Sequence, residues 1–163
     1  MDDSLRLAPL LASEPAGPVV DVGSGGGAPG IPLALALPDR EFVLLEASSR
    51  KCDFLRRYAP ANARVVWGRA EEQETDWAGC AVAKALAPPP VAAEWCLPLV
   101  RPGGGAFLLV GRSADAQPAR AVAERLNAEL ADTEAGILVF RKLGPTPPGF
   151  PRRSGMARKR PLA

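Results

Sequence analysis

A glycine-rich stretch near the N-terminus is the part of the sequence best suited to bind a ligand. It occupies residues 23–30, after the apolar run 18–22 and before the apolar run 31–37. Glycines let the chain turn sharply and approach a ligand closely, and the amides of a following helix can face it. The spacing fits GxGxxG from Gly25 and GxGxxA from Gly23. This pattern predicts a nucleoside or dinucleotide site, and NAD stays open as its ligand.

Charged residues follow three apolar runs that we expect to be strands. Glu46 ends the run 41–46 and lies 23 residues after Gly23, so its carboxylate can reach the two hydroxyls of a bound ribose. Residues 69–72, Arg-Ala-Glu-Glu, follow the run 64–67 and by themselves indicate only a charged loop. Lys84 ends the run 80–84, where it can meet an anionic group of a ligand or extend into solvent.

The C-terminal part of the chain is strongly basic. Residues 141–163 contain seven basic residues and no acid, whereas the remaining chain has 13 basic and 18 acidic residues, a net charge of −5. Basic patches that include an aromatic residue bind phosphate backbones through counterion release. We therefore predict that the five cations after Phe150 contact nucleic acid. They are Arg152, Arg153, Arg158, Lys159 and Arg160.

The pattern of apolar runs indicates the elements that position these residues. Strands are expected at 18–22, 41–46, 64–67, 80–84, 106–111 and 136–142, and helices at 31–37, 48–58, 91–99 and 114–130. Residues 101–105 are expected to form a turn. Alternating strands and helices predict one α/β domain over residues 1–143, with a mostly parallel sheet and helices on both faces. Residues 144–163 are expected to be an irregular basic tail.

Composition narrows the possible chemistry. The 163 residues, 47% hydrophobic and 23% charged, contain no apolar run of 18 residues, and Met1–Arg6 lack a cationic signal region, so a cytoplasmic protein is expected. With no histidine and no CxxC pair, a metal site is not expected, and we predict buried thiols at Cys52, Cys80 and Cys96. The missing histidines also remove the commonest general base, so any reaction must proceed without an imidazole.

Several stretches together resemble one bacterial enzyme family, RsmG (GidB). They are DVGSGGGAPGIPLAL, LLEASSRKCDFL, GRAEE, WCLPLVRPGG and FRKLGPTPPGFPRRSGMARKRPL, in the family's order and over nearly the whole chain. The glycine turn is shared with many methyltransferases, whereas PGIPL and TPxxFPRRxG are more specific. The resemblance implies a Rossmann-like S-adenosylmethionine-dependent methyltransferase. It also implies that the enzyme methylates N7 of a guanine in 16S ribosomal RNA, with that RNA or the small ribosomal subunit as partner.

The resemblance also implies roles for individual residues. Glu46 would hold the ribose, Ala70 and Glu71 would flank the adenine, and Lys84 would contact the cofactor. The turn would line the methionine and ribose part of the site, through Gly23, Ser24, Gly25 and Ala28. No catalytic acid or base is expected, because N7 of guanine has an exposed lone pair and no proton.

The chain departs from the family in three places. Only Asp3-Ser4-Leu5 matches the end of the family's N-terminal helical segment, Lys84 stands where arginine is usual, and Val110 stands where lysine is usual. A non-catalytic or weakened RNA-binding relative therefore stays open as an alternative. An NAD-dependent oxidoreductase is the other alternative. Such an enzyme usually needs a proton donor for hydride transfer, and a sequence without histidine offers Tyr58 as its one tyrosine.

Overall fold

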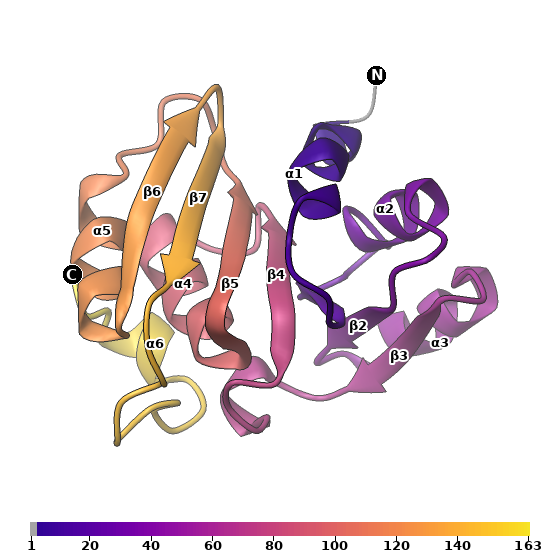
Figure 1. Ribbon diagram of the computed structural model, residues 1–163. Coiled ribbons are helices and arrows are strands. Elements are labelled where there is room, and N and C mark those ends of the chain that lie inside the picture. The colour runs from indigo at the N-terminus through magenta and orange to yellow at the C-terminus, as the bar shows by residue number, and fades with distance from the viewer. Residues whose placement is uncertain (1–2) are drawn as a thin grey trace.

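A single sheet of seven strands organises the molecule (Figure 1). The computed structural model describes residues 3–163, so Met1 and Asp2 of the opening segment lie outside the described part. The strand order is β3-β2-β1-β4-β5-β7-β6. The first five strands pair in parallel, and β7 runs antiparallel to both β5 and β6. The strands are β1 (Val19–Val22), β2 (Phe42–Glu46), β3 (Ala63–Trp67), β4 (Ala78–Lys84), β5 (Val100–Leu109), β6 (Ala128–Glu134) and β7 (Ile137–Lys142).

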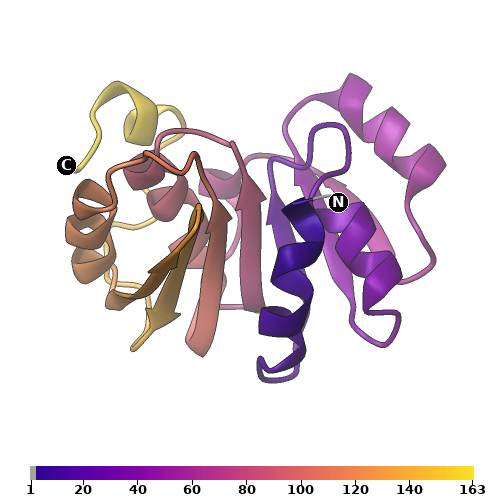
Figure 2. The same ribbon diagram turned by 90° about the horizontal axis from the view of Figure 1, so that it is seen from above.

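Helices cover both faces of this sheet, and Figure 2 shows them as two groups. The first group comes from the N-terminal half of the chain and contains α1 (Ala8–Ala12), α2 (Gly30–Ala36) and α3 (Ser49–Tyr58). The second group contains α4 (Pro89–Cys96), α5 (Gln117–Arg125) and α6 (Met156–Lys159). Short 3-10 helices lie at η1 (Asp3–Leu7), η2 (Ala70–Glu72) and η3 (Leu97–Leu99). The predicted α/β fold with a mostly parallel sheet is confirmed.

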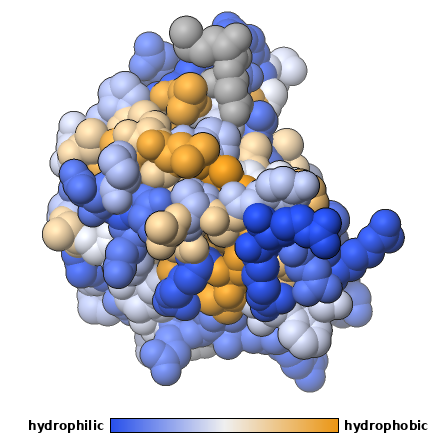
Figure 3. Space-filling view, turned by 90° about the vertical axis from the view of Figure 1, so that its right-hand side faces the viewer, coloured by the Kyte–Doolittle hydropathy of each residue, from blue (hydrophilic) through white to orange (hydrophobic). Residues whose placement is uncertain are grey.

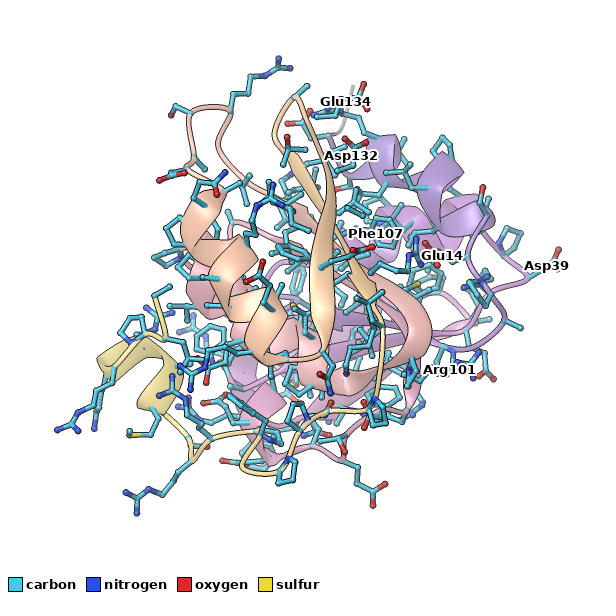
Figure 4. All side chains as sticks on the ribbon, turned by 60° about the vertical axis from the view of Figure 1, so that its left-hand side comes forward. Glu14, Asp39, Arg101, Phe107, Asp132 and Glu134 are labelled. Atoms are coloured by element: carbon cyan, nitrogen blue, oxygen red, sulfur yellow. The ribbon has the colours of Figure 1, made fainter. Side chains whose placement is uncertain are left out.

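The core consists of two layers because successive side chains of a strand point to opposite faces of the sheet. In β5, Phe107 packs with Leu7 and Leu33 on the side of α1 and α2. Its neighbour Leu108 packs with residues of α4 and α5 on the other side. Figure 4 labels Phe107 behind the β6–β7 hairpin. Both faces are buried, as a sheet covered by helices on two sides requires.

The side of the molecule formed by α2, α3 and β3 is largely hydrophilic. Figure 3 views this side and shows scattered apolar side chains among polar ones. Ser48 caps the start of α3, since its hydroxyl accepts a hydrogen bond from the Lys51 amide at 3.3 Å. Between residues 3 and 163 there is no helix with the length and apolarity needed to cross a membrane.

The prediction of a turn at residues 101–105 is wrong, because these residues belong to β5. Val100 pairs with Ala78 and Gly105 pairs with Cys80, with a register shift between them. A side chain at Gly104 would overlap the Gly79 carbonyl oxygen of the neighbouring strand. The glycines therefore permit close contact between two strands at an irregularity instead of ending the strand.

The prediction of one helix over residues 114–130 is also wrong. Helix α5 ends at Arg125, and residues from Ala128 form the edge strand β6. Asn127 has a φ of +54°, a left-handed conformation that asparagine adopts more readily than most residues and that ends helices. The β6–β7 hairpin closes through Ala135 and Gly136, which both have positive φ, as a tight two-residue turn requires.

The tail, residues 144–163, packs against the rest of the molecule and ends in a short helix. Phe150 and Leu162 pack against the core, and Ala157 in α6 is buried. The expectation of a wholly irregular tail is thus corrected for α6. Apolar contacts of Phe150, Ala157 and Leu162 fix a stretch whose proline and arginine content resembles that of a disordered segment.

A buried ammonium group holds the start of the tail in place. The Lys142 Nζ lies 2.8–2.9 Å from four acceptors that share its three hydrogens, namely Asp76, Thr146 and the carbonyls of Leu97 and Val100. Burial by itself would raise the pKa of the Asp76 carboxyl, but hydrogen bonds from Lys142 and Thr146 hold that pKa below its ordinary value. The charge of Asp76 therefore compensates a buried cation at the junction of β7, η3 and the tail.

Asp76→Asn should lower the free energy of unfolding by about 3 kcal/mol, because it leaves the buried Lys142 charge without its partner. Asparagine also suits the positive φ of residue 76, so backbone strain does not add to the effect. Asp53→Asn is the control, since Asp53 pairs with Arg56 at an exposed site and should cost at most about 1 kcal/mol. Urea denaturation measures both variants, and equal small effects would show that the Lys142 network does not depend on Asp76.

Candidate functional site

A pocket of about 350 Å³ lies at the carboxyl ends of β1, β2 and β4. Its volume falls within the range of about 300–1,000 Å³ that is usual for ligand sites. The chain reverses its direction of strand addition between β1 and β4, and ligands of open α/β sheets bind at such a switch point. Predicted residues in its wall are Gly23, Gly25, Glu46, Ala70, Glu71 and Lys84.

The glycine turn forms the pocket wall beside β1. Gly23 has a φ of +72°, and a side chain there would collide with Leu86 on the opposite wall. Gly25 also has a positive φ, and the nearest atom to a side chain placed there is the Gly23 carbonyl oxygen at 3.8 Å. The turn therefore presents bare backbone to open space in the pocket.

The expectation that helix amides face the ligand is corrected by the first turn of α2. The Gly30 amide donates to the Asp21 carboxylate at 3.0 Å, and the Ile31 amide donates to the Gly27 carbonyl at 2.7 Å. These two amides are already satisfied within the protein. The amides of Gly23 and Ser24 donate to the Leu45 carbonyl, and the Gly25 amide donates to Glu46, so at these positions the turn offers a ligand close contact with its backbone and no free amide.

Glu46 connects the glycine turn to the start of α3. Its Oε1 accepts a hydrogen bond from the Gly25 amide and its Oε2 accepts one from the Ser48 amide, both at 2.8 Å. The side chain is 8% exposed and lines the pocket. A carboxylate can accept about four hydrogen bonds, so each oxygen retains capacity for a ligand hydroxyl.

The other predicted cofactor residues lie at different depths. Ala70 and Glu71 belong to η2, Lys84 ends β4, and all three residues line the pocket. Ser24 is buried beneath the turn, where its hydroxyl donates to the Asp21 carbonyl at 3.1 Å. Ala28 is half-buried ahead of α2. Neither Ser24 nor Ala28 is part of the pocket lining.

Sequence reasoning missed Asp21, which supports the glycine turn from below. Its side chain is fully buried in β1, Oδ2 accepts from the Gly30 amide, and Oδ1 has no hydrogen-bond partner among residues 3–163. Burial raises the pKa of the Asp21 carboxyl to about 7, although the hydrogen bond from the Gly30 amide opposes this shift. An acidic residue in an otherwise apolar strand directly before the turn was the signal for this role.

The predicted nucleic-acid residues of the tail divide into two sets. Arg152 forms a paired contact with Glu94, at 2.5 and 2.7 Å, and Arg158 lies over the Trp95 ring beside the pocket. Arg153, Lys159 and Arg160 are exposed, as Arg158 is, but they are not part of the pocket lining. Glu94 and Trp95, on α4, had not been predicted as site residues, and a glutamate within the apolar sequence PPVAAEWC was the available signal.

The fold is shared with methyltransferases of known structure. The Thermus thermophilus 16S rRNA N2 methyltransferase RsmC, solved in complex with AdoMet and guanosine, has a TM-score of 0.64 and 15% identity, covering 90% of this chain and 40% of that chain. A TehB-like SAM-dependent methyltransferase from Corynebacterium glutamicum has a TM-score of 0.61 and 21% identity, covering 85% and 86% of the two chains. This chain therefore has the Rossmann-like fold of these methyltransferases, with a pocket at the switch point of its sheet.

Sequence comparison identifies the family. A model of GidB, described as rRNA small subunit methyltransferase G, matches residues 1–135. Ribosomal RNA small subunit methyltransferase G of Synechococcus sp. strain JA-2-3B'a(2-13) is 38% identical, over 98% of this chain and 72% of the relative. Its counterpart in Pelotomaculum thermopropionicum is 35% identical, over 98% and 76%. The chain belongs to the RsmG (GidB) family of S-adenosylmethionine-dependent 16S rRNA methyltransferases.

The alternative of an NAD-dependent oxidoreductase is wrong. The six-strand order 3-2-1-4-5-6 is usual for dinucleotide-binding sheets, whereas here the antiparallel strand β7 lies between β5 and β6. The structural relatives described above are methyltransferases. The glycine turn alone did not distinguish the two classes, because both bind a nucleoside at the end of β1.

Asp21→Asn should change how stability depends on pH. Because the folded-state pKa of Asp21 is raised from 3.8 to about 7, the folded protein retains a proton that the unfolded chain has lost in this window. The free energy of unfolding should therefore contain a component that falls as pH rises through the window, and the variant should lack that component. Urea denaturation of both proteins across the window measures the difference, and parallel curves would contradict the titration of Asp21.

Glu46→Gln should weaken S-adenosylmethionine binding about 10-fold or more, because hydrogen bonds to charged groups contribute about 1.5–3 kcal/mol each. The glutamine amide nitrogen cannot accept a bond, so either Gly25 or Ser48 loses its acceptor. Glu41→Gln, just before the same strand and outside the pocket, is the control and should bind normally. Calorimetry gives both affinities, and equal values would remove Glu46 from the site.

Proposed function

We propose that this protein transfers the methyl group of S-adenosylmethionine to N7 of a guanine in 16S rRNA. The observation that carries the proposal is a nucleoside-sized pocket at the switch point, with the Glu46 carboxylate in its wall, in a chain of the RsmG family. The small ribosomal subunit is the proposed form of the substrate.

The pocket residues fit S-adenosylmethionine. Gly25 leaves open space for the methionine part, and Gly23 lines the pocket beside it. Glu46 has acceptor capacity for the ribose hydroxyls, and Ala70 and Glu71 line the pocket where we propose that the adenine binds. Lys84 supplies a positive charge at the end of β4, suited to the cofactor carboxylate. Ser24 and Ala28 act indirectly in this proposal, by shaping the turn.

The chemistry requires little of the protein beyond positioning. S-adenosylmethionine supplies a methyl group attached to a positively charged sulfur. The N7 atom of guanine has a lone pair and no proton, so no side chain needs to remove one, in agreement with a sequence that lacks histidine. The task of the pocket is to align the reactants and exclude water. In this proposal the glycine turn and Glu46 position the cofactor for that reaction.

RNA contact is proposed for the exposed cations of the tail. Arg153, Lys159 and Arg160 project from the segment that contains Arg158, and Arg158 lines the pocket. Phosphates bound to these cations would lie close to the methyl-transfer site. Arg152 supports the same surface through its pairing with buried Glu94.

A turnover assay with small ribosomal subunits and with free 16S rRNA tests this function. We expect formation of 7-methylguanosine, detected by mass spectrometry of the digested RNA, and faster turnover on the subunits. RNA made with 7-deazaguanosine, in which carbon replaces N7, should accept no methyl group at the site. Methylation of that RNA would place the reaction at another atom.

Cofactor binding without turnover on either RNA would favour the alternative of a non-catalytic relative. Lys84→Arg then tests the departure at that position. A planar guanidinium can form two bonds where an ammonium forms a point contact, so cofactor affinity should be kept or improved.

A further inference from the structure

The tail reaches the rim of the cofactor pocket and is held there by polar contacts at both ends of a short stretch. Arg152 donates from Nε and Nη2 to the two carboxylate oxygens of Glu94 on α4, and its Nη2 also donates to the Arg160 carbonyl at 2.9 Å. The Glu94 side chain is 3% exposed. A planar, two-bond contact with a buried carboxylate fixes the orientation of this stretch better than a surface ion pair would.

The same stretch is bonded to the wall expected to face the adenine. The Ser154 hydroxyl donates to Glu72 at 2.9 Å, and the Gly155 amide donates to Glu71 Oε2 at 3.0 Å. Gly155 has a φ of +88°, so a glycine is needed for its amide to adopt this position. Both acceptors belong to η2, which carries Ala70 and forms part of the pocket lining. The tail and the adenine wall therefore form one bonded unit.

Arg158 completes the wall from the tail side. Its guanidinium carbon lies 5.3 Å from the centre of the Trp95 ring, and both side chains line the pocket. The Trp95 Nε1 is buried and has no hydrogen-bond partner among residues 3–163. Packing and the cation above it therefore hold the indole in place, and Arg158 itself borders the pocket.

We infer that residues 152–158 form a wall of the adenosine site and that Arg158 stacks on the adenine of S-adenosylmethionine. This inference rests on the proposed function of the same pocket. A guanidinium plane can stack on an aromatic ring on each side, so Arg158 can lie between Trp95 and a purine. Arg158 was expected to bind RNA from the sequence, whereas its position assigns it to the cofactor.

The assignment changes what loss of the tail would do. If the tail served RNA alone, its cations could be removed without effect on cofactor affinity. With Glu71 bonded to Gly155 and Arg158 in the pocket wall, affinity for the cofactor depends on residues more than 80 positions after η2 in the sequence. RNA that binds Arg153, Lys159 or Arg160 would contact the same stretch of the tail that is bonded to η2.

Calorimetric titration of S-adenosylhomocysteine into Arg158→Ala tests the inference. We expect about 10-fold weaker binding than wild type, as for the loss of one stacking partner of a base. Arg158→Lys keeps the charge but lacks the planar guanidinium. Its affinity for S-adenosylhomocysteine should therefore be reduced nearly as much as that of Arg158→Ala. Arg153→Ala removes an exposed cation from the same segment and should leave the cofactor affinity unchanged. Thermal unfolding of each variant, with an expected midpoint near that of wild type, shows that the fold is intact.

Adenosine as a second probe locates the contact. Arg158→Ala should weaken adenosine binding by the same factor as S-adenosylhomocysteine binding, because both contain the adenine. A loss confined to S-adenosylhomocysteine would place Arg158 at the methionine end and overturn the inference, as would equal affinities of wild type and Arg158→Ala. Failure of wild type itself to bind S-adenosylhomocysteine would instead overturn the proposed cofactor site.

Discussion

The two hydrogen bonds accepted by Glu46 are the interaction on which the site depends. They join the Gly25 amide of the turn after β1 to the Ser48 amide at the start of α3. The turn and the helix come from different connections of the sheet, so no local preference would hold them at one distance. The Glu46 carboxylate does so, together with the Leu45 carbonyl that accepts from the Gly23 and Ser24 amides, and the carboxylate keeps acceptor capacity at the pocket. Shape and recognition are thus supplied by the same side chain.

Close approach of backbone to backbone is the second constraint around this carboxylate. A side chain at Gly23 would strike Leu86, and one at Gly30 would strike Asp21 and Leu44. The glycine turn therefore fits between β2, β4 and the buried Asp21. In this respect the turn has two functions, since Gly25 faces open space while Gly23 and Gly30 serve packing. The spacing of the glycines in the motif cannot by itself show which of them faces the pocket and which permits close packing.

Much of the fold could be predicted from the sequence because the central strands are short apolar runs bounded by turn residues. Predicted ranges at 18–22, 41–46 and 64–67 correspond closely to β1, β2 and β3. The errors at 101–105 and 114–130 have physical causes. Glycines inside β5 resemble a turn unless the irregular pairing with β4 is known, and Asn127 ends a helix whose amphipathic pattern continues into the alternation of β6. Both outcomes depend on tertiary pairing, which local propensity does not contain.

The residues of the site also differ in how far they could be predicted from the sequence. Glu46 could be placed because it ends a strand that the sequence reveals, and strand ends meet at one edge of a parallel sheet. Ala70 and Glu71 were assigned to the cofactor through the family resemblance, since by themselves they indicate only a charged loop. Glu94 and Trp95 could not be placed this way, since they act through the tail, about 60 residues later in the chain. Contacts at this separation leave no periodic pattern in the sequence.

The charge division between an acidic body and a basic end has a structural explanation as well as a functional one. Arg141 pairs with Glu14, which Figure 4 labels, Lys142 pairs with Asp76, and Arg152 pairs with Glu94. Three of the seven cations from residue 141 onward thus neutralise acids of the preceding chain, and Arg158 lies over Trp95. Complementary charge attaches the end of the chain to the sheet and to α4. Arg153, Lys159 and Arg160 are exposed on the same segment as Arg158, so RNA bound to them in the proposed function would lie beside the pocket.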